Sequence, residues 1–431
     1  MTMIAGIVLF VSFFLLLLFG APIALAIILS SVATFLLIVP FDVAILTSAQ
    51  RMVTGIDNFT MLAIPLFVLS GIIMNNGGIA FRLVNFAKVL VGRLPGSLAH
   101  TNVVGNMLFG SISGSSVASA AAMGRIMTPM QTNQGYKKTY SAAVNIASAP
   151  TGLIIPPSSV LIVYSLVSGG TSVAALFMAG YIPGILWGLA VMVVAYFMAK
   201  KEGYSISETP NTKDKVYIVG SAIPSLFLIV IVIGGIVAGI FTATEGAAVA
   251  VLYATLLSLI YKSLKVRDIP AILKETIEIT GMILFLITAS ALFSLVMSYI
   301  GLPEALSRAL LSITENQIGI ILIMIAILLM IGTFMDITPA VLIFTPIFLP
   351  VAQTFGMDPV HFGMVVCFAL CIGNMTPPVG SALFVGCSVA EVRIENVIKT
   401  LLPYFAAVII VLLFVAFIPQ ISLFLPNLFG L

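Results

Sequence analysis

Charged residues are scarce in this sequence. Only 8% of its 431 residues are Asp, Glu, Lys or Arg, whereas 61% are hydrophobic. The mean hydropathy is +1.24, and such a composition excludes a soluble domain, in which about a quarter of the residues are charged. Apolar runs of about 20 residues, the length that crosses a bilayer core, recur along the chain. We therefore predict an all-α polytopic protein embedded in a lipid bilayer.

Residues that build disulfides and metal centres are also few. Cys367 and Cys371 lie one helical turn apart in apolar sequence, and Cys387 follows nearby, which indicates packed thiols. His100 and His361 have no carboxylate or cysteine cluster at ligand spacing, so neither zinc nor haem is predicted. The net charge of +3 is small and the basic residues are scattered, which argues against a nucleic-acid partner.

The chain contains an internal repeat. A shift of 221 residues aligns three prolines and two glycines of the first half with their counterparts in the second half, without a gap. Proline is only 22 of 431 residues, so these matches do not arise from composition. The pairs are Pro129 with Pro350, Gly135 with Gly356, Gly152 with Gly373, Pro156 with Pro377 and Pro157 with Pro378.

Each half has the same order of segments. Two apolar segments are followed by a basic or amphipathic connector, a third span, a re-entrant helical hairpin, an interrupted helix and a final span. Five crossings per half place the two copies in opposite orientations, which predicts the inverted-topology repeat of secondary transporters. The first repeat, 1–210, has scaffold helices at 1–95, a hairpin at 97–131, a broken helix at 139–170, a final span at 173–199 and a linker at 200–215. The second repeat, 211–431, has scaffold helices at 216–299, a hairpin at 318–353, a broken helix at 360–388 and a final span at 397–418.

The basic residues predict the orientation in the membrane, because Lys and Arg collect on the cytoplasmic side. With the N-terminus outside, 15 of the 18 basic residues fall in cytoplasmic segments. Arg51 and Arg308 fall outside, and Arg125 lies within a hairpin. Both termini are therefore predicted to be periplasmic, with the linker in the cytoplasm. The fifteen are Arg82, Lys88, Arg93, Lys137, Lys138, Lys200, Lys201, Lys213, Lys215, Lys262, Lys265, Arg267, Lys274, Arg393 and Lys399.

Each interrupted helix contains glycine and a double proline, in APTGLIIPPS at 149–158 and CIGNMTPPVGS at 371–381. Proline removes an amide donor, and its ring clashes with the carbonyl one turn earlier. Such backbone survives at membrane depth only inside protein or around a cavity. One such break is often a simple kink, but two matched breaks predict a site.

The two hairpin tips, GSISGSS at 110–116 and GTFMDITP at 332–339, are too polar to face lipid. Their hydroxyls and the carbonyls released at the breaks are suitable ligands for a small cation, and helix N-termini attract anions. We expect two related sodium sites, each between one tip and one broken helix. The alternative role of Ser111, Ser113, Ser115 and Ser116 is close helix packing.

Three charged residues lie in apolar segments, where charges are functional candidates. Asp336 at the second tip is suited to offset a cation, to bond a substrate hydroxyl or to cap the next helix. Arg125 is placed either to pair with a carboxylate substrate or to reach the cytoplasmic surface. Glu245 begins a helix, where stabilisation of the helix dipole is the favoured role.

With these features, the chain resembles the large membrane subunit of a tripartite ATP-independent periplasmic (TRAP) transporter. The resemblance covers essentially the whole chain, and the double-proline segments are its most specific part. It rests on AIPLFVLSGIIMNNGGIA at 63–80, GSISGSSVASAAAMG at 110–124, GLIIPPS at 152–158, GIFTATEGAAVAV at 239–251 and GNMTPPVGSALFV at 373–385.

This resemblance implies sodium-driven uptake of an organic acid across the bacterial inner membrane. It implies an elevator, in which a transport domain with the hairpins and broken helices moves against a scaffold. Two partners are implied, a small four-helix membrane subunit and a soluble periplasmic substrate-binding protein. Family members carry C4-dicarboxylates, sialic acids and other sugar acids, and segment 145–165 is most similar to the sialic-acid branch.

The resemblance also implies residue roles by position. Position 125 commonly holds a small residue in the family, so Arg125 is a departure that leaves its role open. Sodium site 1 would use Gly110, Ser113, Gly152, Ile155 and Pro157, and sodium site 2 would use Gly332, Met335, Gly373 and Thr376. The substrate residues would be Ser115, Ser116, Arg125, Asn145 and Asp336.

Other functions fit the sequence less well. A stand-alone sodium/dicarboxylate cotransporter would share the repeat, but its hairpin tips would be expected to carry Ser-Asn-Thr triplets. This sequence contains none. A channel would need a continuous polar path. An intramembrane enzyme would need a nucleophile with a base, paired aspartates or a metal cluster, and Asp336 has no acidic partner in either hairpin. We therefore predict a transporter and not an enzyme.

Overall fold

The computed structural model describes residues 2–92, 94–204, 212–314, 316–377 and 380–431, so Arg93, linker residues 205–211 and Pro378 lie outside it. Within these ranges the chain is helical and has no strand, which confirms the predicted all-α class. The first half contains α1 (Thr2–Leu18), α2 (Ile23–Leu36), α3 (Phe41–Thr54), η1 (Phe59–Leu62), α4 (Ala63–Asn76), α5 (Ile79–Val91), α6 (Ser97–Ser113), α7 (Ser116–Asn133), α8 (Lys138–Ser148), α9 (Thr151–Ile154), α10 (Ser159–Val167) and α11 (Val173–Glu202). The second half contains α12 (Thr212–Val237), α13 (Ala243–Ile260), η2 (Val266–Asp268), α14 (Ile269–Tyr299), α15 (Leu302–Ile313), α16 (Gln317–Phe334), α17 (Ile337–Thr354), α18 (Pro359–Asn374), α19 (Ser381–Ala390), α20 (Ile394–Phe417) and α21 (Gln420–Leu428).

Many of these helices are long and apolar enough to cross a membrane. In the described ranges eight meet both criteria, and a bent pair, Lys138–Ile154 with Ser159–Val167, adds a ninth. The eight are Phe59–Asn76, Val173–Glu202, Asp214–Val237, Ala243–Ile260, Val266–Tyr299, Gln317–Phe334, Ile337–Thr354 and Ile394–Phe417. The chain is therefore a multi-pass membrane protein.

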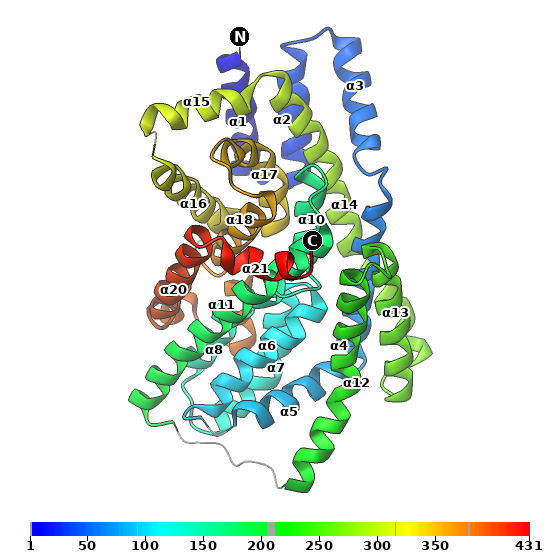
Figure 1. Ribbon diagram of the computed structural model, residues 1–431, viewed down its shortest axis with the longest axis vertical. Coiled ribbons are helices and arrows are strands. Elements are labelled where there is room, and N and C mark those ends of the chain that lie inside the picture. The colour runs from blue at the N-terminus through cyan, green and yellow to red at the C-terminus, as the bar shows by residue number, and fades with distance from the viewer. Residues whose placement is uncertain (1, 93, 205–211, 315, 378–379) are drawn as a thin grey trace.

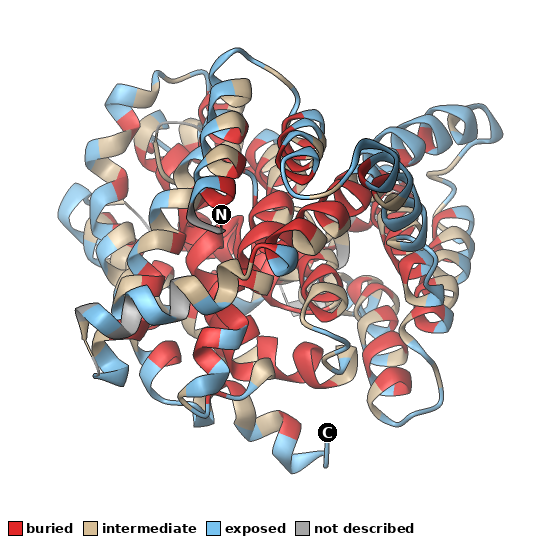
Figure 2. Cartoon of the chain, turned by 90° about the horizontal axis from the view of Figure 1, so that it is seen from above, coloured by how far each residue is buried: buried red, intermediate tan, exposed pale blue. Residues whose placement is uncertain are grey.

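The outer surface is apolar. Large hydrophobic side chains such as Leu18 and Phe19 are 83% and 86% exposed. In water such a surface would drive association, but it is the expected surface of a protein surrounded by lipid. Seen from above, buried residues concentrate in the central helices and exposed residues in the outer ones (Figure 2). The exposed outer helices are thus suited to contact with lipid.

The two hairpins and the two interrupted helices pack against one another. Hairpin α6–α7 packs on α8, and α6 also contacts α9, whereas hairpin α16–α17 packs on α18. Contacts also cross between the halves, because α7 packs on α19 and α10 packs on α17. In Figure 1, α6 and α7 lie in the lower part of the molecule and α16 and α17 in the upper part. Each broken helix thus contacts a hairpin from the other half.

Other long helices pack against the hairpins and the interrupted helices. α4 packs on α13, and α14 packs on α2 and α4. α4 also contacts α6 and α10, whereas α14 contacts α17. These two helices therefore form the wall that faces the hairpins. The C-terminal helix α21, which the sequence did not predict, packs on α11.

Candidate functional site

The first helix break lies directly against the first hairpin. The backbone after α9 is extended at Ile155, where ψ is 123°, and Pro156 and Pro157 follow in the gap before α10. Gly110 of α6 and Gly152 of α9 are in backbone contact, because a Cβ on Gly152 would lie 2.2 Å from the Gly110 Cα. Two residues predicted for the first sodium site thus meet.

The other residues predicted for that site are more dispersed. Ser113 ends α6, and its Oγ donates to the Gly110 carbonyl at 3.3 Å. The Ile155 side chain packs on α11, where a Cβ on Gly184 would lie 2.3 Å from Ile155 Cγ1. Pro157 lines a small pocket beside α4, separate from the pocket that Ser113 lines. Any cation ligand from Ile155 or Pro157 would therefore be a backbone oxygen, because neither side chain has one.

The second break repeats the glycine contact. A Cβ on Gly373 of α18 would lie 2.3 Å from the carbonyl carbon of Gly332 of α16. Met335 ends α16 with extended backbone, at φ −122° and ψ 146°. Thr376 follows α18, and its Oγ1 donates to the Ile372 carbonyl at 2.7 Å. In both halves a hairpin arm therefore contacts a broken helix through two glycines.

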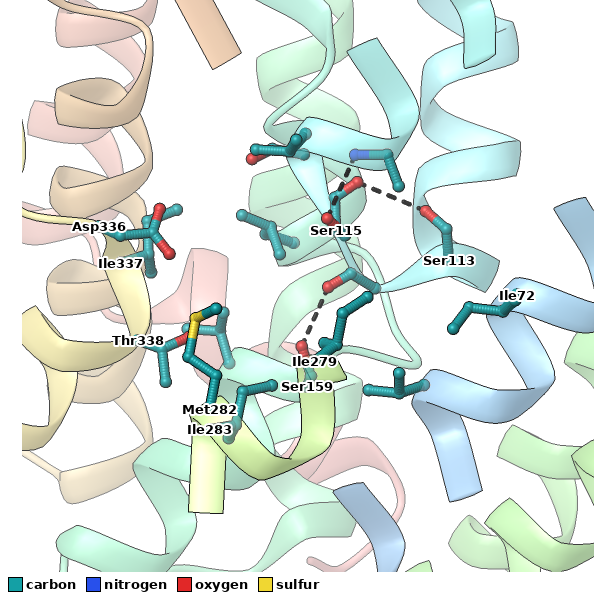
Figure 3. Close-up of a pocket in the computed structure, with 18 of the residues that line it drawn as sticks. Ile72, Ser113, Ser115, Ser159, Ile279, Met282, Ile283, Asp336, Ile337 and Thr338 are labelled. Atoms are coloured by element: carbon teal, nitrogen blue, oxygen red, sulfur yellow. Dashed lines mark hydrogen bonds between the residues drawn. The ribbon is translucent and has the colours of Figure 1, made fainter. Parts of the chain in front are cut away.

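Both hairpin tips and both interrupted helices contribute to one cavity of about 220 Å³. The first tip lines it through residues 113–118 and the second through residues 336–338, together with Asn374 and parts of α4, α10 and α14. Figure 3 shows Ser113 and Ser115 on one side and Asp336 and Thr338 on the other. The Ser159 Oγ donates to the Gly114 carbonyl at 3.0 Å, which ties α10 to the first tip.

Three helices begin at this cavity. Their first residues line it, namely Ser116, Val117 and Ala118 of α7, Ser159 and Val160 of α10, and Ile337 and Thr338 of α17. A helix N-terminus has partial positive charge and amides without intrahelical acceptors. No Lys or Arg is found among the described lining residues. The cavity can therefore attract an anion through helix termini.

A hydrogen-bond network joins the two tips through the second break. Asn374 Nδ2 donates to Ser116 Oγ at 2.7 Å, across 258 residues of sequence. The Asn374 Oδ1 accepts from the Ala382 amide at 3.0 Å and from the Ser381 hydroxyl. Ser381 Oγ also lies 3.1 Å from Asp336 Oδ1. Asn374 thus couples α7, α19 and the second tip.

Among the described residues, Asp336 is one of two carboxylates that line the cavity. It occupies the N-cap position of α17, but its side chain makes no capping hydrogen bond. The carboxylate contacts Ser381 and is exposed to the cavity. The other carboxylate belongs to Glu275 of α14. The structure therefore does not show the capping role considered for the Asp336 side chain.

Asn145 lies away from the cavity, in a buried network on α8. Its Oδ1 accepts from Asn106 Nδ2 at 3.0 Å, and its Nδ2 donates to the Ala120 carbonyl at 2.8 Å. Asn106 also contacts Ser148 Oγ and accepts from Ser119 Oγ, both at 2.7 Å. Asn145 thus joins α8 to both arms of the first hairpin.

Arg125 lines a different pocket, of about 360 Å³, between α7 and α19. Lys138 and Glu391 also line this pocket, and Lys138 Nζ lies 3.0 Å from Glu391 Oε2. Arg125 and Asp336 therefore do not share a cavity.

Glu245 lies at the start of α13 and forms a capping box with Thr242. The Thr242 amide donates to the Glu245 carboxylate at 2.8 Å, as expected for a residue that stabilises a helix start.

Sequence reasoning assigned no site role to Asn374, Ser381 or Glu275. Asn374 and Ser381 lie within the CIGNMTPPVGS segment, so a search of that segment for side-chain amides and hydroxyls would have found both. Glu275 lies near the start of the candidate span Val266–Tyr299, directly after Lys274, which belongs to the basic set assigned to the cytoplasmic side. In the sequence, Glu275 together with Lys274 and Glu278 has the charge pattern of an ordinary exposed helix face, so it was not singled out as a site residue.

Comparison with known proteins supports a transporter. Residues 10–421 match the family model described as "Tripartite ATP-independent periplasmic transporter, DctM component". The chain is 53% identical to the "Uncharacterized protein YgiK" of Salmonella typhimurium, over 98% of each chain. It is 39% identical to the "Sialic acid TRAP transporter large permease protein SiaM" of Vibrio cholerae, over 95% of this chain and 96% of the relative. It is 36% identical to the "C4-dicarboxylate TRAP transporter large permease protein DctM" of Rhodobacter capsulatus, over 96% of this chain and 97% of the relative.

A solved structure shares the fold. The YdaH transporter of Alcanivorax borkumensis superposes with a TM-score of 0.64 at 12% identity, over 88% of this chain and 90% of that chain. The family match spans nearly the whole sequence and agrees with the predicted resemblance. This chain belongs to the DctM component family of tripartite ATP-independent periplasmic transporters, and it is the large permease subunit of a membrane transporter, not an enzyme.

Proposed function

We propose that the chain carries out sodium-gradient-driven uptake of an organic acid by an elevator mechanism. The observation that carries this proposal is the single cavity at which both hairpin tips and both interrupted helices meet. In the proposed mechanism the hairpins and broken helices move as a transport domain against a scaffold that includes α4 and α14. The two halves act as inverted repeats, so each supplies one tip and one break.

The proposed sodium sites are the two glycine contacts. In each contact the carbonyl oxygen of the hairpin glycine, Gly110 or Gly332, lies only 2.8 or 2.7 Å from where a Cβ on the facing glycine of the break would stand. Carbonyl and hydroxyl oxygens suit hard cations such as Na⁺. Binding of Na⁺ would draw each tip onto its break and complete the substrate cavity, and this coupling makes the gradient a driving force.

The proposed substrate is an organic anion, with sialic acid favoured. Three helix N-termini at the cavity offer positive potential to a carboxylate. Hydroxyls from Ser113, Ser115, Ser159 and Thr338 suit the hydroxyl groups of a sugar acid. The relative SiaM is named for sialic acid, and the relative DctM of Rhodobacter capsulatus for C4-dicarboxylate, which is the second candidate.

The proposed assembly lies in the bacterial inner membrane with both termini in the periplasm. It includes a small four-helix membrane subunit and a soluble periplasmic binding protein that delivers the substrate. Membership of a tripartite family supports these partners. The exposed apolar helices offer surface to both lipid and a small membrane subunit.

Uptake into proteoliposomes tests this function. The chain is reconstituted with its small subunit, and uptake of radiolabelled sialic acid is measured with and without binding protein. An inward sodium gradient is compared with potassium at equal ionic strength. We expect uptake only when sodium and binding protein are both present.

Other outcomes separate the alternatives. Sodium-driven uptake without binding protein would indicate a stand-alone cotransporter. Uptake of a C4-dicarboxylate in place of sialic acid would keep the mechanism and change the substrate. Equal uptake in sodium and potassium would refute sodium coupling.

A further inference from the structure

The cavity has an acidic residue on its scaffold wall. Glu275 of α14 lines the cavity, and its side chain is exposed. The ion pair on this stretch joins Lys274 to Glu278, with Nζ and Oε1 3.9 Å apart. Among the described residues, no salt bridge involves Glu275. Its negative charge is therefore open to whatever occupies the cavity.

Glu275 is the first residue of α14 that lines the cavity. The residues of α14 that line it continue from Glu275 through Met282 to Leu286 along one helix face. Met282 lies beside the second tip in Figure 3, about 10 Å from Glu275 along the helix axis at 1.5 Å per residue. Asn75, at the end of α4, is the other polar scaffold residue among the described lining. Glu275 is thus the cavity-lining residue of α14 nearest the start of that helix, whereas the second tip lies farther along it, beside Met282.

This part of α14 is predicted to face the cytoplasm. The segment before α14 contains Lys262, Lys265 and Arg267, which belong to the basic set assigned to the cytoplasmic side. The start of α14 is therefore its cytoplasmic end, and Glu275 lies seven positions into that helix. An anion that leaves the tips for the cytoplasm along α14 passes Glu275.

We propose that Glu275 is a release residue, whose negative charge weakens binding of the organic anion on the cytoplasmic side and promotes its discharge. This inference rests on the proposed import of an organic acid. A unit charge about 10 Å away in a partly hydrated site changes anion affinity about three- to tenfold. When the transport domain moves to the periplasmic side, the tips leave this part of α14 and the repulsion is relieved. The charge thus weakens binding in one state and speeds release of the anion from that state.

Substitution of Glu275 tests this role in the assembled transporter. Proteoliposomes containing the small subunit are loaded with unlabelled sialic acid, or with the C4-dicarboxylate if that is the transported acid. Sodium- and binding-protein-dependent uptake of the labelled acid is then measured. Binding protein outside the vesicles supports uptake only by transporters whose periplasmic face points outward and whose cytoplasmic face points into the lumen. Inhibition of uptake by the luminal acid therefore measures the affinity of the cytoplasmic face for that acid. For Glu275→Gln we expect half-inhibition at a luminal concentration about three- to tenfold below wild type.

Glu278→Gln is the matched control, because Glu278 is on the same helix but is absent from the cavity lining. A Glu275→Cys variant separates charge from size. The three native cysteines of this chain are buried, so the new thiol is the accessible one of this chain, and unsubstituted transporter treated with the same reagents is the control for thiols of the partners. An anionic methanethiosulfonate reagent applied to it should restore wild-type inhibition, whereas a cationic reagent of similar size should lower the inhibitory concentration further.

The outcomes distinguish the two proposals. Active transport with the same luminal inhibition in Glu275→Gln and Glu278→Gln would overturn the release role alone. The same follows if anionic and cationic reagents act alike. A wild-type complex without sodium-driven uptake would overturn the proposed function, and the release role with it.

Discussion

At the scale of the residue, the glycine at each helix break is required by the backbone against it. Gly152 and Gly373 do not have positive φ. A Cβ on either would lie 2.2 to 2.3 Å from backbone atoms of the facing glycine. Backbone atoms cannot move aside as the end of a flexible side chain can. Any larger residue must therefore separate the hairpin from the break.

Gly152→Ala should destabilise the protein by about 1–3 kcal/mol, as overpacking of a close contact does. We expect a lower midpoint of thermal unfolding, together with weaker sodium dependence of uptake, because the separated backbone forms the proposed sodium site. Gly220→Ala on α12 is the control, because a Cβ there meets no atom within 4 Å. An unchanged midpoint and unchanged sodium dependence in Gly152→Ala would contradict this account.

At the scale of the element, α19 ends at a residue with an unfavourable backbone conformation, and the side chain of the same residue forms an ion pair. Glu391 is the C-cap of α19 with φ +54°, in the left-handed region that favours glycine. Its carboxylate pairs with Lys138 at the start of α8. An ion pair this exposed stabilises by about 0–1 kcal/mol, whereas a left-handed residue other than glycine costs about 1 kcal/mol or more.

Glu391→Gly should therefore be more stable than Glu391→Ala, by about 1 kcal/mol. Both variants lose the ion pair, but only glycine relieves the strain. Thermal unfolding of the two purified variants measures the difference, and Lys138→Ala, which loses the pair alone, should resemble Glu391→Ala. If Glu391→Ala is as stable as Glu391→Gly, strain at this C-cap is negligible.

At the scale of the whole molecule, the basic residues predict one orientation. A membrane protein holds most Lys and Arg of its short loops in the cytoplasm, and 15 of 18 meet this rule when both termini are periplasmic. A C-terminal fusion to alkaline phosphatase should therefore be active in cells, and a fusion to green fluorescent protein dark. A truncation fused after Lys201 should give the reverse. A fluorescent C-terminal fusion would invert the proposed topology and the direction assigned to Glu275.

Local chemistry made much of the molecule predictable. Proline and glycine act within one helical turn, so the breaks and the hairpin tips could be read from short segments. The apolar runs needed only counting, because the bilayer requires every spanning segment to be a helix or part of a closed barrel. The glycines of the two contacts lie in or next to such segments, and residues predicted for each sodium site meet there.

The sequence by itself determined that the chain crosses a membrane, where its helices break and to which family it belongs. Tertiary structure decided which polar groups meet: Asn374 reaches Ser116 across 258 residues, whereas Asn145 and Arg125 lie outside the cavity between the hairpin tips. Helix formation depends on neighbours within four residues. Which helix faces which depends on packing between distant segments, and no short motif encodes that arrangement.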